Sequence, residues 1–220
     1  GLEVSPEELL DEDAPLDPGS IYKVVFKENH LVEPVDAGDS FELQEYYDYP
    51  ERYRGVFSRY LPHLSVLMNC VYWEERYPRL VTREALMALM DRGPLGLKVI
   101  GDISCDVAGG VEATVKATQP DDPVFVYDPR SAEIEMGFKG PGVAILAVDN
   151  LPCELPREAS LHFSASLGPY LKNLAETDFE APLETLSLAA PLKRALIVHR
   201  GELTPDFQYL QEFLSEEEEG

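Results

Sequence analysis

The chain has 220 residues, of which 45% are hydrophobic and 10% aromatic, enough apolar material for one large domain or two unequal lobes. Its formal net charge of −23, from 41 acidic and 18 basic residues, argues against binding to nucleic-acid phosphates or to an anionic membrane surface. Because the run of ~20 apolar residues that a membrane span needs is also missing, we expect neither a nucleic-acid partner nor a membrane partner. Three scattered cysteines predict reduced thiols in the cytoplasm, and their spacing predicts no metal site.

The first sixty residues predict short and interrupted elements. Seven acidic residues and no basic one lie between Glu3 and Asp17, which is typical of a solvent-exposed loop or helix face. Residues 21–26 predict a short strand. Residues 42–59 predict helical turns that Pro50 interrupts.

The middle of the chain alternates apolar runs with a helix. Residues 64–73 are nearly all apolar, as expected for a strand buried on both faces of a parallel sheet. A helix follows over residues 82–90, with Thr82 as its N-cap. Further apolar runs, separated by Gly, Pro and Asp, occupy residues 97–103, 124–127 and 142–148. This alternation predicts an α/β sheet.

A long helix is predicted to begin at Pro156, a residue suited to the first helical position. Its apolar residues recur at helical spacing, so one face is expected to be covered; they are Phe163, Leu167, Leu171 and Leu174. The Gly168-Pro169 pair is expected to kink it. Residues 191–198 and 205–214 predict two more helical pieces or a helix and a strand, and residues 215–220 an acidic tail.

Polar side chains follow three of the predicted strands. They are Asn69 with Tyr72, the run from Asp102 to Asp106, and Asp149 with Asn150. If these strands are parallel neighbours, their ends line one crevice, with a nucleotide on one side and a polar substrate on the other. The alternative is that Asp106 and Asp149 only cap the elements that follow them.

Other chemistry-bearing patterns are weak. Neither G-x-G-x-x-G nor G-x-x-x-x-G-K-[ST] occurs, and Gly109-Gly110 fits a turn as well as a phosphate contact. The four histidines have no partner at a suggestive spacing. Cys105 lies next to Asp106, whose carboxylate raises a thiol pKa, so we do not expect thiol catalysis.

Several segments together carry a family resemblance that runs through nearly the whole chain in order. They are residues 69–74 (Asn-Cys-Val-Tyr-Trp-Glu), 78–80 (Pro-Arg-Leu), 101–106 (Gly-Asp-Ile-Ser-Cys-Asp) with Gly109-Gly110, 149–152 (Asp-Asn-Leu-Pro) with 158–160 (Glu-Ala-Ser), and 192–194 (Leu-Lys-Arg) with 200–204 (Arg-Gly-Glu-Leu-Thr). With these the chain resembles the lysine-ketoglutarate reductases, the reductase part of bifunctional aminoadipic semialdehyde synthase. It is also similar to the lysine-forming saccharopine dehydrogenases.

The resemblance implies an α/β fold of the alanine dehydrogenase and transhydrogenase type. Residues 1–151 would be an incomplete, Rossmann-like dinucleotide-binding domain, a partial parallel sheet with flanking helices. Residues 152–220 would be a C-terminal helical segment returning to the substrate lobe, with the acidic tail. A saccharopine dehydrogenase domain in the same parent chain is the further expected partner, and the compartment would be the mitochondrial matrix if the protein is animal-like.

The implied reaction is NADPH-dependent reductive condensation of L-lysine with 2-oxoglutarate to saccharopine, with NAD as the alternative cofactor to NADP. Ser104, Cys105 and Asp106 would face saccharopine, with Asp106 as the electrostatic partner of an amino group. The residues that would contact the dinucleotide are Tyr72, Ile103, Val148, Asp149, Asn150 and Leu151. Residues 2–6 would match the second strand of the dinucleotide fold, whose end normally contacts the ribose, and Ser5 in place of an acid there would tolerate a 2′-phosphate.

The chain also departs from the family pattern. The family's catalytic lysine and histidine and its glycine-rich phosphate loop lie before the region seen here, so we expect no catalytic residue in this chain and no turnover by it alone. Residues 111–114 (Val-Glu-Ala-Thr) stand where a Ser-Ile-Glu-Phe type segment is expected. Two alternatives stay open: a catalytically silent partner or regulatory module that keeps the ligand cleft, and a different amino-acid dehydrogenase of the same superfamily.

Overall fold

The computed structural model describes residues 1–214, and the chain divides into two units, Gly1–Glu154 and a second that begins at Leu155. The sequence placed this division after Leu151, on the short 3-10 helix η4 (Leu151–Glu154) that ends the first unit. The acidic tail at residues 215–220 lies outside the described residues.

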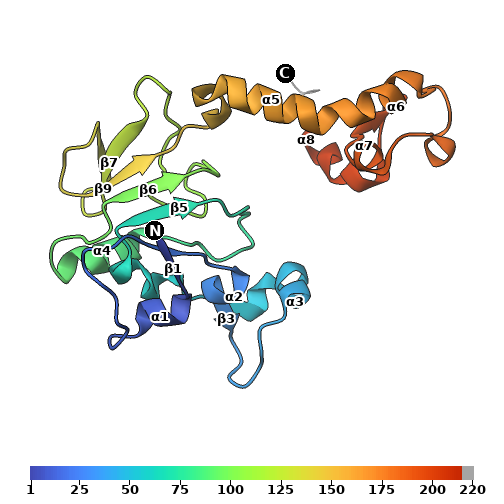
Figure 1. The fold of residues 1–220 in the computed structure, drawn as a ribbon. Coiled ribbons are helices and arrows are strands. Elements are labelled where there is room, and N and C mark those ends of the chain that lie inside the picture. The colour runs from blue at the N-terminus through green and yellow to red at the C-terminus, as the bar shows by residue number, and fades with distance from the viewer. Residues whose placement is uncertain (215–220) are drawn as a thin grey trace. The chain divides into compact units, whose positions relative to one another are not determined.

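The centre of the first unit is a five-stranded sheet in the order β5-β6-β9-β7-β8 (Figure 1). β5 (Val66–Asn69), β6 (Val99–Asp102) and β9 (Val143–Leu146) run parallel to one another. β7 (Val124–Asp128) and β8 (Glu133–Met136) complete the sheet as antiparallel strands. The expected α/β architecture with three parallel neighbours is confirmed, in a sheet that is mixed rather than purely parallel.

The antiparallel part follows from short connections. Only residues 129–132 join β7 to β8, and so short a link can reverse the chain but cannot make a parallel crossover. The return from β8 to β9 passes close over β7, where a Cβ on Gly142 would lie 1.7 Å from the Tyr127 carbonyl oxygen and one on Gly140 2.9 Å from the Val126 side chain. Glycine is therefore required where the chain crosses the strand.

One face of the sheet is packed. Helix α4 (Arg83–Asp91) begins as predicted, with the Thr82 hydroxyl accepting a hydrogen bond from the Ala85 amide at 3.2 Å. Its Leu86 is fully buried in one cluster with Ile100 and Ile145 of the sheet. The 3-10 helices η2 (Phe57–Arg59) and η3 (Leu61–His63) add Phe57 and Leu61 to the same cluster.

The prediction that residues 64–73 form a strand buried on both faces is wrong. In β5 the side chains alternate, with Leu67 and Asn69 buried while Val66 and Met68 are 56% and 57% exposed. β5 is an edge strand of the sheet, and within the first unit its second face is open to solvent. The apolar composition of the run gave no sign of this difference between its two faces.

A short strand–helix–strand segment precedes the sheet within the first unit. β1 (Leu2–Val4), helix α1 (Pro6–Leu10) and β2 (Tyr22–Val24) form it, with the two strands paired in parallel. Ser5 caps α1: its hydroxyl accepts from the Glu8 amide, and the Glu8 carboxylate accepts from the Ser5 amide. The acidic segment is thus a largely exposed helix and loop, as the sequence predicts.

Between β2 and β5 the chain forms a second group of short elements. Helix α2 (Glu28–Leu31) leads to β3 (Val32–Pro34), which pairs antiparallel with β4 (Tyr53–Gly55). The predicted interruption at Pro50 is confirmed, since α3 (Leu43–Asp48) ends before it and the 3-10 helix η1 (Pro50–Arg52) begins at it. β4 is a strand where helical turns were predicted, because pairing with β3 overrides local propensity.

The second unit begins with a helix that has its predicted start and kink. Helix α5 (Pro156–Leu167) meets the 3-10 helix η5 (Gly168–Tyr170) and continues as α6 (Leu171–Glu176). The remaining elements are η6 (Leu183–Thr185), α7 (Ala190–Arg194), β10 (Val198–His199), β11 (Glu202–Leu203), η7 (Pro205–Leu210) and α8 (Gln211–Leu214). β10 and β11 form a hairpin whose two turn residues, Arg200 and Gly201, both have positive φ.

Among the described residues of the second unit, 155–214, nothing covers the long helix as expected. Phe163 and Leu171 are 65% and 53% exposed, although their helical spacing predicts a buried stripe. Periodicity identifies a face suited to packing but does not identify what covers it.

Replacing Ile100 by Ala is expected to lower the free energy of unfolding by about 2–5 kcal/mol, because it opens a cavity in the sheet core. The exposed Val66→Ala is the matched control and should cost about 0.5 kcal/mol or less. Urea unfolding followed by the fluorescence of the single tryptophan, Trp73, measures both. Equal losses in the two variants would contradict this assignment of the core.

Candidate functional site

The three strands with polar ends are parallel neighbours, which is the condition for the predicted crevice. The last residues of β5 and β6, Asn69 and Asp102, are paired in register. β9 runs parallel on the other side of β6, with Leu146 opposite Gly101. The loops that follow the three strands therefore leave the sheet at the same edge, where open parallel sheets bind their ligands.

Asp102 connects these strand ends. Its side chain is buried, with one carboxylate oxygen accepting from the Asn69 side-chain amide at 2.8 Å and from the Cys105 amide at 3.2 Å. The other oxygen accepts from the Thr114 hydroxyl at 2.5 Å. No salt bridge to Asp102 exists within residues 1–214, so these three donors replace the water that a buried carboxylate loses.

The loop after β6 has an unusual backbone. Cys105 has φ +56°, a left-handed conformation that is uncommon for any residue with a side chain. Its thiol donates to the Ala147 carbonyl after β9 at 2.8 Å, and the Ser104 hydroxyl donates to the Val71 carbonyl after β5 at 2.6 Å. The loop is thus tied to both neighbouring strands, and strained backbone held in this way is often found at functional sites.

The electrostatics of this edge are negative. Burial raises the pKa of the Cys105 thiol, and the carboxylates of Asp102, Asp149 and Asp106 raise it further. The thiol is therefore protonated and neutral near pH 7, which agrees with the expectation that it is not a nucleophile. Asp106 and Asp149 are exposed, so their negative charge is offered to whatever binds here.

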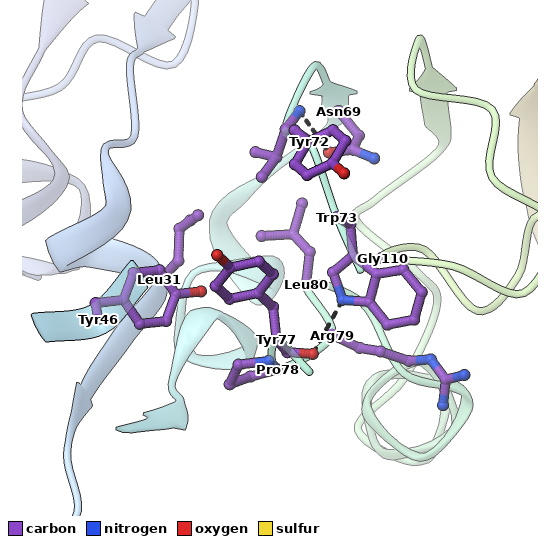
Figure 2. A pocket seen from close by; sticks show the side chains of 11 residues that line it. Leu31, Tyr46, Asn69, Tyr72, Trp73, Tyr77, Pro78, Arg79, Leu80 and Gly110 are labelled. Carbon is purple, nitrogen blue, oxygen red and sulfur yellow. Dashed lines mark hydrogen bonds between the residues drawn. The ribbon is translucent and has the colours of Figure 1, made fainter. Parts of the chain in front are cut away.

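A pocket lies beside the end of β5 (Figure 2). The Trp73 indole donates to the Tyr77 carbonyl at 3.1 Å, and the Arg79 guanidinium lies 5.5 Å from the centre of the Trp73 ring. The Tyr72 side chain donates to the Glu74 carboxylate at 2.5 Å, and the residue is 76% exposed. The other lining residues are Leu31, Tyr46, Asn69, Val71, Pro78, Leu80 and Gly110.

The paired glycines serve packing in this pocket wall. A Cβ on Gly110 would lie 3.3 Å from the Trp73 ring, and one on Gly109 would lie 2.5 Å from the Asp106 side chain. Arg79 donates to the carbonyls of Gly109 and Ala108 at 3.1 and 3.0 Å. These close approaches account for both glycines without a phosphate.

The predicted site residues fall into two groups. Tyr72 lines the pocket, whereas Asp106 and Asp149 do not, so this pocket is not the single crevice that the sequence predicts along all three strand ends. Asp106 and Asp149 instead raise the pKa of the Cys105 thiol in the loop after β6. The Val148 side chain is buried and leaves only its main chain for a ligand. The exposed or partly exposed members of the predicted set are Ile103, Ser104, Cys105, Asn150 and Leu151.

Sequence reasoning missed Thr114 and its bond to Asp102. Thr114 lies in the segment that departs from the expected family pattern, and it is fully buried. No spacing rule signals this contact, because a loop between the two residues brings them together. Within residues 1–214 no three metal-ligating side chains gather at one place, and no helix has the length and apolarity to cross a membrane.

Thiol labelling of Cys105 is expected to stay slow near neutral pH and to accelerate only above about pH 8.5, the ordinary range of a cysteine thiol. Because the Cys105 pKa is raised, folding favours the protonated thiol. The contribution of this thiol to folding stability is therefore complete below the ordinary pKa of a cysteine, and it is lost as the pH rises through the folded-state pKa. The measurement is the pH dependence of dithionitrobenzoate labelling with Cys70 and Cys153 replaced by Ser. A profile shifted to lower pH than that of a free cysteine would contradict it.

Comparisons with known proteins place this geometry in a family. A profile of the family described as alanine dehydrogenase/PNT, C-terminal domain, matches residues 56–206. That range includes the parallel strands β5, β6 and β9 and the loops that follow them.

Individual relatives agree with the profile. The chain is 39% identical over 191 residues to alpha-aminoadipic semialdehyde synthase of Arabidopsis thaliana, covering 86% of this chain and 17% of that protein. It is 31% identical over 223 residues to the mitochondrial alpha-aminoadipic semialdehyde synthase of Mus musculus, covering 94% of this chain and 24% of that protein. A saccharopine dehydrogenase [NAD(+), L-lysine-forming] of Emericella nidulans is 29% identical over 132 residues, 56% of this chain and 32% of that protein.

The chain thus spans about a fifth of the length of the two synthases that it matches over most of its own length. Since the profile covers more than half of the chain, including the sheet edge where the polar strand ends meet, the chain belongs to the alanine dehydrogenase/PNT C-terminal domain family.

Proposed function

We propose that this chain is the C-terminal part of a lysine-ketoglutarate reductase, which joins L-lysine and 2-oxoglutarate by NADPH-dependent reductive condensation to saccharopine. The observation that carries the proposal is the meeting of three parallel strand ends around the Cys105 loop. The resemblance to the semialdehyde synthases over most of the chain supports the same reaction.

The substrate side of the site would be the loop after β6. Asp106 is exposed there, and the additional negative charge of Asp102 and Asp149 favours a cationic amine, such as that of lysine, over an anion. The Ser104 hydroxyl and the neutral Cys105 thiol both donate to main-chain carbonyls, which fixes the loop that carries Asp106.

The cofactor side would be formed by Tyr72, Ile103 and residues 148–151. The exposed Tyr72 ring offers a flat aromatic surface next to the polar end of β5, which fits a planar heterocycle. Val148 would contact the nucleotide through its main chain. When bound, the reduced nicotinamide supplies the hydride that converts a carbon–nitrogen double bond into an amine.

Two further features belong to the same proposal. The relatives are long synthases, and we propose a parent chain that also carries a saccharopine dehydrogenase domain. The compartment would be the cytoplasm or the mitochondrial matrix, and the mouse relative is named as mitochondrial.

A catalytically silent partner or regulatory module is the second candidate. It is favoured by the hydrogen bonds at the strand ends, which involve Asp, Asn, Thr, Ser and Cys side chains but no Lys or His within the described residues. In that case the complete natural protein would bind saccharopine or nucleotide without turning over.

Nucleotide choice is tested at Ser5, the N-cap of α1 at the end of β1. Ser5→Asp keeps a good N-cap but adds a carboxylate where a 2′-phosphate would lie, so NADPH affinity of the complete natural protein should fall about tenfold or more. NADH affinity should stay the same, and Ser5→Thr is the uncharged control. Fluorescence titration of both variants and of the unchanged protein measures the affinities for NADPH and NADH, and an equal loss for both nucleotides in Ser5→Asp would contradict NADPH as the cofactor.

The isolated 220 residues are expected to show no turnover, because the hydrogen bonds at the strand ends hold no acid–base pair suited to imine chemistry. NADPH oxidation with lysine and 2-oxoglutarate measures this, with the complete natural protein as the positive control. A robust rate from the isolated chain would contradict the assignment as a part of the enzyme. Absence of activity from the complete protein, with ligand binding retained, would favour the silent module.

A further inference from the structure

We infer that Asp102 is the positioning residue of this site: its buried carboxylate fixes the distance between the loop that carries Asp106 and the loop that carries Tyr72. The inference rests on the proposed function, in which these two loops face the substrate and the nucleotide. Asp102 itself touches neither ligand, because it is 1% exposed.

The first step is the number of separate segments that donate to this carboxylate. Asn69 belongs to β5, Cys105 to the loop after β6, and Thr114 to the segment that leads toward β7. Thr114 is itself tied back to the loop, since its carbonyl accepts from the Ala108 amide at 2.8 Å. A single side chain therefore holds three segments, whose donors lie 3, 12 and 33 positions from it in the sequence.

The second step is the strain in the loop. Cys105 and Ala108, on either side of Asp106, have φ +56° and +52°, and neither is glycine. Such conformations persist only when the surroundings impose them. The bond from the Cys105 amide to Asp102 and the bond from the Ala108 amide to Thr114 are the contacts that impose them.

The third step connects this loop to the nucleotide side. Asn69 donates to Asp102, and its side-chain oxygen accepts from the Val71 amide at 3.2 Å. The Val71 carbonyl in turn accepts from the Ser104 hydroxyl. Val71 immediately precedes Tyr72, and Asn69 and Tyr72 both line the pocket (Figure 2). Asp102 thus lies between the two loops and restrains both.

A carboxylate suits this role better than an amide. One oxygen of Asp102 accepts two hydrogen bonds and the other accepts one, so both side-chain positions must be acceptors. In an asparagine, one of the two carboxylate oxygens is replaced by an NH2 group, which is a donor and cannot accept the hydrogen bond from the Thr114 hydroxyl. The asparagine would also lose the added strength of charge-assisted bonds.

The experiment uses two variants and two matched controls, each with Cys70 and Cys153 replaced by Ser so that Cys105 is the remaining thiol. Asp102→Asn alters the acceptor, and the isosteric Thr114→Val removes one donor without a change of volume. Thr118→Val is the control for Thr114, because Thr118 is 3% exposed and its hydroxyl donates to the Pro123 carbonyl instead. Asp128→Asn is the control for Asp102 at the end of β7, where within residues 1–214 the carboxylate accepts a hydrogen bond from the local Arg130 amide alone.

The first readout is the rate of Cys105 labelling at pH 8, which needs no activity. Loosening the loop exposes the thiol, so Asp102→Asn and Thr114→Val should react about tenfold faster than the parent, while both controls keep its rate. Labelling as slow as in the parent for both test variants overturns the inference. Because Thr114→Val preserves shape, it keeps the test decisive even where Asp102→Asn fails to fold.

The second readout is ligand binding and turnover by the complete natural protein that carries the same substitutions. We expect the Kd of saccharopine and the KM of lysine to rise about tenfold in the test variants, with NADPH affinity falling less. Faster labelling with unchanged saccharopine binding overturns the positioning role. If the complete natural protein without substitutions binds no saccharopine, the proposed function is overturned, and with it the role of Asp102 in that reaction. The labelling result does not depend on that outcome.

Discussion

The structure of this site depends on one buried carboxylate, that of Asp102, which is held by donors rather than by a cation. Burying a charge without such donors would cost several kcal/mol, so Asn69, Cys105 and Thr114 are needed as much as Asp102 is. The parallel register that places Asn69 opposite Asp102 makes the first of these bonds possible. The pairing of β5 with β6 therefore also fixes the geometry of the site.

Within the first unit, helices cover only one face of the mixed sheet that carries the loops of the site. One face packs against α4 and the 3-10 helices η2 and η3, while Val66 and Met68 stay exposed on the edge strand β5. The return from β8 to β9 crosses β7 closely at Gly140 and Gly142, and Thr118 bridges to Val148 just after β9. Of the three parallel strands that end at the site, β5 and β6 are joined through α4, and β6 and β9 are joined through the segment that carries the β7–β8 hairpin.

The chemistry of the sheet edge follows from charge and burial. The chain as a whole carries −23, and at the end of β6 the acidic groups Asp102, Asp106 and Asp149 all raise the pKa of the Cys105 thiol. A neutral thiol in a negative setting is a poor nucleophile and a good packing group, and the same field attracts an amine. The proposed reduction of an imine formed from lysine suits such a site, because its substrate and its product both carry amino groups.

The sequence by itself determined the local features: the α4 cap at Thr82, the start of α5 at Pro156, the kink at Gly168, the acidic strand ends and the family resemblance. These depend on residue type and on spacing within a few positions. The tertiary structure decided the direction of β7, the open face of β5 and the bonds from Asp102 to Asn69 and Thr114, residues 33 and 12 positions away. Such features depend on which distant segments pair, and periodicity along the chain carries no information about that choice.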